Sequence, residues 1–461
     1  MINKENKIKI ATSSFRDPSG FVFFEDKKVY RQVNQSYKNI YDSIKESGLY
    51  EELIKENLLI NFQEVDGPVA EKSPVYKILK VNKVPFISYP YEWCFSQLKE
   101  AALLTLKIQK KALKQGFSLK DASAYNIQFY QGRPIFIDIL SFEKYEEKPW
   151  IAYRQFCQHF LAPLSLMSLK DHRLNFLTKE FIDGIPLDLA SSILPKKSYF
   201  KFLLLSHIHF HARGQKYYAD KEIKNQQRKM SKKSLMNLLK SLESAVTSLN
   251  WKNQDTEWAA YYKNTNYTKK AFDHKKEIVK EFIKKINPKN IWDLGANNGI
   301  FSLLASKNNV YTIAIDNDAA AIESAYNYIK KKNINNILPL VIDLTNPSSS
   351  IGWQNKERQT LIERGPSDLI MALALVHHLA ISNNTPFIMI AQFFSSMGKN
   401  LIVEFVPKKD TKVKKLLSTR KDIFSEYNQD KFEESFKKYF SIIQKDKVKE
   451  SERILYLMKR I

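Results

Sequence analysis

Residues 291–301, with the sequence IWDLGANNGIF, place one acid and two glycines at a spacing that suits a nucleoside ligand. Asp293 lies near the end of an apolar run, and Gly295 and Gly299 bracket the turn that follows. Glycine lets a backbone turn sharply and approach a ligand closely, as at dinucleotide sites. Asn297 interrupts the nicotinamide-binding pattern G-x-G-x-x-G, and a carboxylate before the first glycine repels pyrophosphate but attracts an amine. The segment therefore predicts a ligand with an amino group rather than a pyrophosphate.

Two further acids follow short apolar runs downstream of this turn. Residues 310–315 are followed by Asp316, close to the offset of roughly 20 residues at which an acid meets ribose hydroxyls in doubly wound folds. After a helical pattern over residues 319–332, residues 337–342 are followed by Asp343. A lone Asp after an apolar run is also common as a solvated strand end or a helix N-cap. Three acids at successive strand ends, however, favour a ligand site.

The same part of the chain contains the strands that such a site needs. Residues 368–373 and 400–405 are short apolar runs, which are typical of strands buried on both faces of a parallel sheet. Residues 439–444 and 453–459 are two more strand-like runs. Because open α/β sheets bind ligands at the carboxyl ends of their strands, the three acids are expected at one edge.

The pattern D-x-G-x-x-x-G resembles the first motif of class I S-adenosylmethionine-dependent methyltransferases. The ligand of that family carries an amino acid moiety and a sulfonium but no phosphate. The resemblance implies an α/β fold with a seven-stranded Rossmann-like sheet, which residues 439–444 and 453–459 close as an antiparallel pair. It also implies S-adenosylmethionine as the cofactor, with Asp343 near the adenine amino group. The expected cofactor-binding residues are Asp293, Gly295, Asn297, Gly299, Asp316 and Asp343.

His377 and His378 follow the fourth strand, where the resembled family exposes side chains toward the transferable methyl group. Either histidine is a candidate general base, with a pKa near its ordinary value of about 6.5. In the alternative, they lie on a helix on which one packs and the other faces water. Glu404 is a further candidate base in the same crevice, since a charge inside an apolar strand must find a partner or a pocket.

A second constellation lies in the amino-terminal half, where residues 119–138 contain Asp121, Asn126 and Asp138. Their spacing resembles the catalytic loop of protein-kinase-like phosphotransferases, most nearly of the aminoglycoside-phosphotransferase branch. In those enzymes the first Asp accepts the substrate proton, and the Asn and the second Asp bind metal. The resemblance implies an α+β kinase-like domain with ATP and magnesium as candidate cofactors. In the alternative, Asp121 and Asn126 belong to a hairpin turn, which favours both residue types.

Several positions depart from the kinase pattern. Lys120 replaces the usual His before the catalytic Asp, and Asp138 is followed by Ile-Leu rather than by Phe-Gly. The hairpin expected to cover a nucleotide, residues 13–25, contains only Gly20 as a glycine. Arg31 stands near the place of the phosphate-gripping Lys, and an Arg is no simple replacement for that point charge.

The surrounding segments agree with a kinase-like order. Residues 37–58 predict a helical run, residues 81–89 the hinge strand, and residues 95–115 the long helix before the catalytic loop. Three histidines alternate in a later helical segment, which scatters them around the helix axis and argues against a metal site. They are His207, His209 and His211.

A chain of 461 residues is too long for one ordinary domain. We expect a kinase-like domain over residues 1–218, a basic helical connector over residues 219–270 and a class I methyltransferase domain over residues 271–461. Residues 261–268 are rich in aromatic side chains and are either a lid over the cofactor or a plain connector.

The formal charge of +24 favours association with polyanions such as RNA, DNA or anionic lipid. The basic residues are dispersed, however, and no nucleic-acid-binding module is recognisable. Cys94 and Cys157 lie far apart in apolar surroundings, which predicts buried thiols in a reducing cytoplasm rather than a disulfide or a zinc site. No segment approaches the roughly 20 apolar residues of a membrane helix, and the first residues lack a signal-peptide core, so we expect a soluble, cytoplasmic protein.

Across its whole length the chain resembles a bacterial family of class I methyltransferases related to a nodulation protein. The residues that carry this resemblance are 14–20, 119–138, 272–278 and 404–410. We therefore expect S-adenosylmethionine-dependent methyl transfer to an oxygen or nitrogen nucleophile, with the amino-terminal domain recruiting the substrate. The alternatives are ATP-dependent phosphotransfer by that domain and a non-catalytic binding scaffold.

Overall fold

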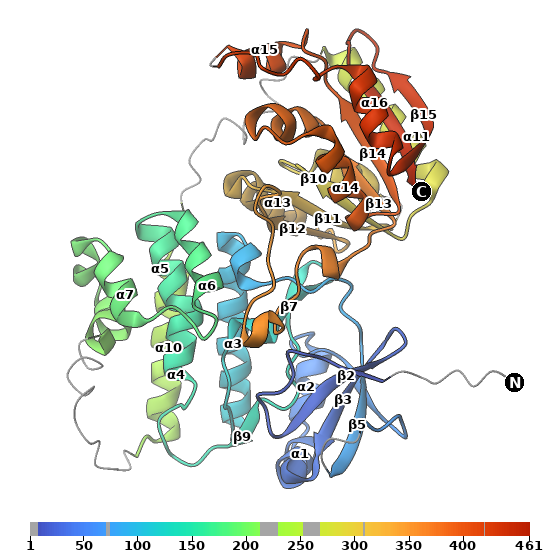
Figure 1. Ribbon diagram of the computed structural model, residues 1–461. Coiled ribbons are helices and arrows are strands. Elements are labelled where there is room, and N and C mark those ends of the chain that lie inside the picture. Colours follow the sequence, from blue (N-terminus) through green and yellow to red (C-terminus); the bar gives the residue numbers. More distant parts are fainter. Residues whose placement is uncertain (1–7, 71–73, 213–228, 252–267, 308, 419) are drawn as a thin grey trace, which may run out of the picture. The chain divides into compact units, whose positions relative to one another are not determined.

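A computed structural model describes residues 8–70, 74–212, 229–251, 268–307, 309–418 and 420–461. The chain forms two compact units, shown in Figure 1. The first comprises Met1–Lys252 together with Ser350–Arg358, and the second comprises Asn253–Ser349 and Gln359–Ile461. Each unit is described by itself.

The first unit begins with an antiparallel sheet of five strands in the order β1-β2-β3-β5-β4. The strands are β1 (Lys9–Ile10), β2 (Gly20–Glu25), β3 (Lys28–Asn34), β4 (Phe62–Val65) and β5 (Val75–Val81). Two helices, α1 (Lys38–Glu46) and α2 (Leu49–Lys55), separate β3 from β4. The prediction of one helical run over residues 37–58 is wrong at Gly48, which adopts a left-handed φ of 75° and starts a second helix.

The predicted hinge strand over residues 81–89 is also wrong, because β5 ends at Val81. Pro85 lies in the middle of this segment and has no N–H to donate to a sheet. The long helix is confirmed as α3 (Phe95–Lys114). After α3 come short strands and turns that carry the kinase-like residues: β6 (Phe117–Leu119), η3 (Ala124–Asn126), β7 (Ile127–Tyr130), β8 (Arg133–Phe136) and β9 (Phe142–Lys144).

The rest of the first unit is helical. Its elements are η2 (Pro90–Glu92), α4 (Tyr153–Phe156), η4 (Cys157–Leu161), α5 (Ala162–Leu169), η5 (His172–Phe176), α6 (Leu177–Glu180), α7 (Leu187–Ile193), η6 (Lys196–Phe200), α8 (Phe202–Leu204), η7 (Leu205–His209) and α10 (Lys232–Ser248). Helix α10 packs against α3 through an apolar stripe, and it belongs to the first unit. Residues 219–228 and 252–267 of the expected connector, and with them nearly all of the candidate lid, lie outside the described residues.

The second unit is built on a sheet of seven strands in the order β12-β11-β10-β13-β14-β16-β15. The first five in this order are mutually parallel, and β16 pairs antiparallel with both β14 and β15. The strands are β10 (Asn290–Leu294), β11 (Tyr311–Asp316), β12 (Ile337–Val341), β13 (Leu369–Ala372), β14 (Asn400–Phe405), β15 (Phe440–Lys447) and β16 (Ile454–Arg460). The predicted mixed α/β class is confirmed.

Helices cover this sheet, and Figure 1 shows α11 and α16 near β14 and β15. The elements are α11 (Lys269–Ile286), α12 (Ile300–Ser306), α13 (Ala319–Lys331), η8 (Trp353–Asn355), η9 (Ile362–Arg364), η10 (His378–Ser382), α14 (Phe387–Met397), α15 (Thr411–Leu417) and α16 (Gln429–Lys437), with η8 in the stretch that belongs to the first unit. The core of the second unit joins Ile278 and Phe282 of α11 to Ile402 and Leu457 of the sheet. This core holds the carboxyl ends of the parallel strands in place.

The stretch Ser350–Arg358, between β12 and β13, packs within the first unit. Glu357 is 4% exposed there and accepts two hydrogen bonds from the Arg16 guanidinium, at 2.6 and 3.3 Å. The Arg358 guanidinium lies 4.0 Å from the centroid of the Tyr125 ring, in η3. Within the first unit, this stretch therefore packs beside the loop that carries the kinase-like residues.

Among the described residues, we find no helix whose length and apolar character would let it cross a membrane.

Candidate functional site

The glycine turn after β10 adopts the backbone conformation that its sequence predicts. Gly295, Asn297 and Gly299 all have left-handed φ angles, of 74°, 51° and 78°. A Cβ atom at Gly295 would lie 3.3 Å from the Leu375 side chain, so this position is tight as well as left-handed. The N–H groups of Gly295 and Ala296 bond to the Ile315 carbonyl at 2.8 and 2.9 Å, which fixes the turn against β11.

Asp293 lies in β10 just before this turn and is 2% exposed. Its carboxylate accepts a hydrogen bond from the Ser302 hydroxyl of α12 at 2.6 Å. Burial raises the pKa of Asp293 to about 7, and the nearby charge of Asp316 adds to this rise. The site therefore holds a carboxyl group that loses its proton readily only when a cation balances it.

Asp316 ends β11 and is tied to the same turn. Its Oδ2 accepts the backbone N–H of Asn297 at 2.7 Å, and its Oδ1 accepts the N–H of Asp318 at 2.9 Å. Burial raises its pKa to about 6, while these two backbone hydrogen bonds oppose the rise. The carboxylate is thus held in one orientation, and each oxygen keeps a lone pair with which to accept a ligand hydroxyl.

Asp343 follows β12, the next strand in the sheet. Its Oδ1 accepts hydrogen bonds from the Thr345 N–H at 2.8 Å and from the Thr345 hydroxyl at 2.7 Å. Since β10, β11 and β12 are neighbours in the sheet, the structure brings Asp293, Asp316 and Asp343 to the carboxyl ends of three adjacent strands. This is the edge at which parallel sheets bind ligands.

The two histidines follow β13 across the same edge. His377 is 1% exposed, and its buried Nδ1 atom has no hydrogen-bond partner among the residues that the structure describes. His378 is partly exposed, and the two ring centroids lie 4.2 Å apart. Ala374, just before them, has a left-handed φ of 53°, which is uncommon for a residue with a side chain and occurs preferentially at functional sites.

The expectation that these histidines titrate near their ordinary pKa is wrong. Burial, together with the charges of Arg453 and Lys412, lowers the pKa of His378 to about 4. Burial also lowers the pKa of His377 well below its ordinary value, with the neighbouring His378 as the second cause. Both rings are therefore neutral at physiological pH, which leaves them able to accept a proton but makes them weaker bases.

Glu404 is completely buried in β14, and it has found partners rather than a pocket. Its carboxylate lies 2.6 Å from the Lys275 ammonium of α11 and 3.6 Å from the Arg453 guanidinium. Arg453 in turn bonds to Asp410 at 2.7 and 3.1 Å. Four buried charges thus join α11, β14, the loop after β14 and the start of β16.

Sequence reasoning missed the partners in this cluster. The single signal was Glu404 itself, because a charge in an apolar strand requires compensation. The partners Lys275 and Arg453 are 129 and 49 positions away, and nothing local marks them. We assign Glu404 a structural role in the cluster.

In the first unit, the kinase-like residues come together, but protein groups already bind the second acid. The Asp138 carboxylate accepts hydrogen bonds from the Arg31 guanidinium at 3.1 Å, from the Leu140 N–H at 3.3 Å and from the Ser141 hydroxyl at 2.5 Å. Burial raises the pKa of Asp121, and the Asp138 charge contributes to this rise. The Asn126 side chain lies close enough to the Asp121 carboxyl group to oppose this rise.

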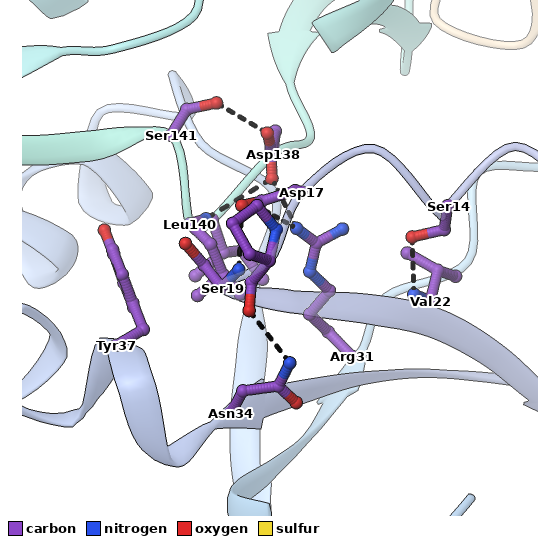
Figure 2. Close-up of polar contacts among 12 residues, drawn as sticks. Ser14, Asp17, Ser19, Val22, Arg31, Asn34, Tyr37, Asp138, Leu140 and Ser141 are labelled. Atoms are coloured by element: carbon purple, nitrogen blue, oxygen red, sulfur yellow. Dashed lines mark hydrogen bonds and ion pairs between the residues drawn. The ribbon is translucent and has the colours of Figure 1, made fainter. Parts of the chain in front are cut away.

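Figure 2 shows Arg31 between two acids. Its Nη2 atom lies 3.2 Å from Asp17 as well as 3.1 Å from Asp138. Lys120, in the place of the usual catalytic-loop His, reaches Asp17 at 3.2 Å and the Ser19 hydroxyl at 2.7 Å. Two protein cations therefore compensate the two acids where a kinase would place magnesium and nucleotide phosphates.

The alternating histidines bind hydroxyl groups in separate places. His207 bonds through its two nitrogens to Tyr153 and Ser241, both at 2.8 Å. His209 bonds to Ser191 and Ser198 at 2.7 and 2.9 Å. Within the part of the chain that the structure describes, no three His, Cys, Asp or Glu residues form a group able to hold a metal ion.

Comparison with known sequences identifies a full-length relative. The chain is 33% identical over 456 residues to the nodulation protein NoeA of Rhizobium meliloti (strain 1021), a match that covers 97% of this chain and 95% of the relative. The chain belongs to the NoeA family. No family model matches the sequence.

Solved structures overlap with parts of this NoeA-family chain. The bifunctional kinase-methyltransferase WbdD matches with 15% identity and a TM-score of 0.29, covering 41% of this chain and 39% of WbdD. The N-methyltransferase NodS from Bradyrhizobium japonicum WM9 matches with 11% identity and a TM-score of 0.31, covering 41% and 97%. Magnesium protoporphyrin IX methyltransferase from Synechocystis PCC 6803, solved with bound SAH, matches with 14% identity and a TM-score of 0.32, covering 44% and 92%.

Proposed function

We propose that the second unit is an S-adenosylmethionine-dependent methyltransferase that acts on an oxygen or nitrogen nucleophile. The observation that carries this proposal is the tie between Asp316 and the left-handed glycine turn, with Asp293 and Asp343 at the adjacent strand ends. This arrangement suits a nucleoside ligand with a cationic amino acid group. The seven-stranded sheet supports the same proposal, since its strand order places these acids on one edge.

The chain's own residues fit such a cofactor. The buried carboxyl group of Asp293, whose pKa is raised to about 7 despite the nearby charge of Lys275, would be stabilised in its ionised form by a ligand ammonium group. The oriented carboxylate of Asp316 is suited to accept hydrogen bonds from the ribose hydroxyls, and Asp343 would lie near the adenine ring. Gly295 and Gly299 adopt left-handed φ angles, which glycine favours because it has no side chain. For the same reason, no side chain at these two positions blocks close approach of the ligand. When bound, the sulfonium supplies an already activated methyl group.

The remaining task of the protein is to orient the acceptor and to remove a proton from it. His378 is the better candidate base, because it is neutral at physiological pH and partly exposed, whereas His377 is buried. The orphaned Nδ1 of His377 is suited to orienting a neighbouring group by a hydrogen bond. If neither histidine takes the proton, positioning alone carries the reaction.

For the first unit we propose substrate recruitment. Its alternative function, ATP-dependent phosphotransfer, needs an Asp138 carboxylate that binds magnesium, and here Arg31, Leu140 and Ser141 occupy that carboxylate. The other alternative is that the whole protein is a non-catalytic scaffold. It would give no role to Asp293, Gly295 and Gly299 of the second unit.

Titration calorimetry of the full chain with S-adenosylmethionine and S-adenosylhomocysteine tests this proposal. We expect saturable binding of both ligands, whereas folded protein that binds neither at millimolar concentration would contradict it. Labelled S-adenosylmethionine should then be incubated with cell extracts, with and without the protein. A labelled protein, RNA or small-molecule fraction would each point to a different class of acceptor.

A further inference from the structure

The first unit exposes two phenylalanine rings on one short turn, residues 196–202, which we call the Phe200 turn. The Phe200 side chain is 91% exposed and that of Phe202 is 75% exposed. Among the described residues, Phe200 is the most exposed of the large hydrophobic side chains. Single exposed hydrophobic residues are ordinary, but neighbouring exposed aromatic rings mark interaction surfaces.

The turn has a rigid base beneath these rings. His209 is 1% exposed, and both of its ring nitrogens bond to hydroxyl groups, of Ser198 in the turn and of Ser191 in α7. The Tyr199 ring stacks on the same imidazole with centroids 3.7 Å apart and an interplanar angle of 15°. A buried histidine thus clamps the residues on the inner side of the turn. The outward position of Phe200 is therefore a fixed feature, which lowers the ordering cost of binding.

The charge of the turn is of one sign. Exposed lysines stand on both sides of Phe200, at Lys196, Lys197 and Lys201. Residues 189–212 contain no Asp or Glu, and they carry a third outward ring at Phe210, which is 52% exposed. Among the described residues, these three lysines form no ion pair, unlike surface lysines elsewhere in the same unit such as Lys111, which pairs with Glu52.

We propose that the Phe200 turn docks the protein on an anionic lipid bilayer surface. The rings of Phe200 and Phe202 would lie at the boundary between headgroups and acyl chains, with the three lysines among the anionic headgroups. Lysines near such a surface are attracted to the anionic headgroups, and transfer of a phenylalanine ring from water to an apolar environment is favourable. Binding of this kind is peripheral and reversible, and it needs no membrane-spanning helix.

The observations favour lipid over nucleic acid. Single-stranded nucleic acid is bound by a basic groove that follows the backbone and by aromatic platforms on which bases stack. Here the two rings project from a short turn that exposed lysines flank. The high net charge of +24 supports either polyanion, whereas apolar rings that project from a turn suit insertion into the bilayer boundary better than a groove that follows a nucleic-acid backbone.

Vesicle flotation with the full chain tests the proposal. Vesicles of phosphatidylcholine alone are compared with vesicles that also contain phosphatidylglycerol, at low and at high salt. We expect binding to the anionic vesicles only, and weaker binding at high salt because the lysine contribution is screened. Phe200→Ser with Phe202→Ser should lower the partition coefficient at least about tenfold, and so should Lys196→Gln with Lys197→Gln and Lys201→Gln.

Two matched controls separate the turn from general effects. Phe176→Ser removes a ring that is 54% exposed elsewhere in the first unit, and it should leave the partition coefficient unchanged. Lys330→Gln with Lys331→Gln and Lys332→Gln removes three exposed lysines at the carboxyl end of α13 and should lower the partition coefficient much less. Thermal unfolding of every variant checks that the fold is retained, which is expected at exposed positions.

Three results would overturn the proposal. The first is no flotation with anionic vesicles, and the second is equal flotation of the wild type and the Phe200 and Phe202 variant. The third is binding of single-stranded RNA that this variant abolishes while vesicle binding persists, which would assign the turn to nucleic acid. None of these results depends on methyl transfer, so the outcome is distinguishable from that of the proposed function.

Discussion

The carboxylate of Asp316 accepts the backbone N–H of Asn297 at 2.7 Å, so the end of β11 is tied to the middle of the glycine turn. A hydrogen bond to a charged group contributes roughly 1.5 to 3 kcal/mol, about twice the value for neutral groups. This bond fixes the direction of the carboxylate before a ligand arrives. The site is therefore organised in advance, which reduces the ordering cost of binding.

Replacing this acid should weaken cofactor binding. We expect Asp316→Ala to weaken the affinity for S-adenosylmethionine by about 1 to 3 kcal/mol through lost ribose hydrogen bonds, measured by calorimetry. Asp368→Ala is the matched control, because Asp368 lies just before the amino end of β13, at the opposite edge of the sheet. Unchanged affinity in Asp316→Ala would mean that the ribose lies elsewhere.

The stability of the free protein should fall as the pH rises, because of Asp293. Its pKa is raised to about 7 in the folded state, whereas an unfolded Asp titrates near 3.9. A raised carboxyl pKa means that the folded state binds the proton more tightly than the unfolded state. The resulting stabilisation is complete below about pH 4 and is lost progressively as the pH rises from about 4 to about 7. In Asp293→Asn, which keeps an oxygen for the Ser302 hydroxyl, this loss should disappear.

Urea unfolding at pH 5 and pH 8 measures this effect. At each pH, the free energy of unfolding of the wild type is subtracted from that of Asp293→Asn. This difference should be larger at pH 8 than at pH 5 by an amount on the order of 2 to 4 kcal/mol. Asp368→Asn serves as the control, because the pKa of the partly exposed Asp368 is lowered rather than raised, chiefly by its hydrogen bond with Lys399, so its titration lies below pH 5. If the two variants show the same pH dependence, Asp293 titrates like an ordinary surface acid.

Removing the His378 side chain should slow methyl transfer without lowering the affinity for the cofactor. We expect His378→Ala to lower the rate at saturating cofactor by about 10² to 10⁴-fold if this ring takes the acceptor's proton. Because burial lowers its pKa to about 4, His378 is already deprotonated at pH 6. The wild-type rate should therefore show no rise between pH 6 and pH 8 from the deprotonation of this histidine. The wild-type rate could instead rise with a midpoint near pH 6.5, and this rise could be absent in His378→Ala. That result would show that the ring has an ordinary pKa in the working enzyme.

Most strands of the second unit could be predicted from the sequence, because a strand buried on both faces is a continuous apolar run. Residues 310–316 show this, since the predicted run and the acid that ends it agree with β11 (Tyr311–Asp316). The glycine turn was equally readable, because left-handed φ angles restrict the residue types at Gly295 and Gly299. Local chemistry carried both signals.

Contacts between distant positions carried no such signal. Arg16 and Glu357 are 341 positions apart, and Arg31 and Asp138 are 107 apart, so neither pair leaves a local pattern. The low pKa of His378 has the same origin, since burial and the charge of Arg453, both set by tertiary structure, cause it. Residue types were thus predictable at these sites, but their protonation and their partners were not.

The buried pair of Lys275 and Glu404 should be sensitive to the loss of either partner. Removing the Lys275 ammonium leaves the buried Glu404 carboxylate with only the Arg453 guanidinium, 3.6 Å away, as a countercharge. We therefore expect Lys275→Met to destabilise the protein by about 3 kcal/mol. Adding Glu404→Leu to this variant should recover part of that loss, since both charges are then gone. Thermal unfolding of the single and double variants measures the coupling.

Lys399 and Asp368 form the matched control for this pair. Their atoms lie 2.7 Å apart, but the Lys399 side chain is 55% exposed. Lys399→Met should therefore cost less than about 1 kcal/mol. A loss as small as this in Lys275→Met would contradict a structural role for the buried cluster.

The first unit should not transfer phosphate. Arg31, Leu140 and Ser141 bind the Asp138 carboxylate, so magnesium should neither shift the thermal unfolding midpoint in the presence of ATP nor promote ATP hydrolysis. Asp138→Ala tests the same residue from the other side. It leaves the Arg31 charge with Asp17 alone, and we expect lower stability without any change in ATP turnover. Magnesium-dependent ATP turnover that Asp138→Ala abolishes would instead restore the phosphotransferase reading, because it would require Asp138 to exchange Arg31 for the metal.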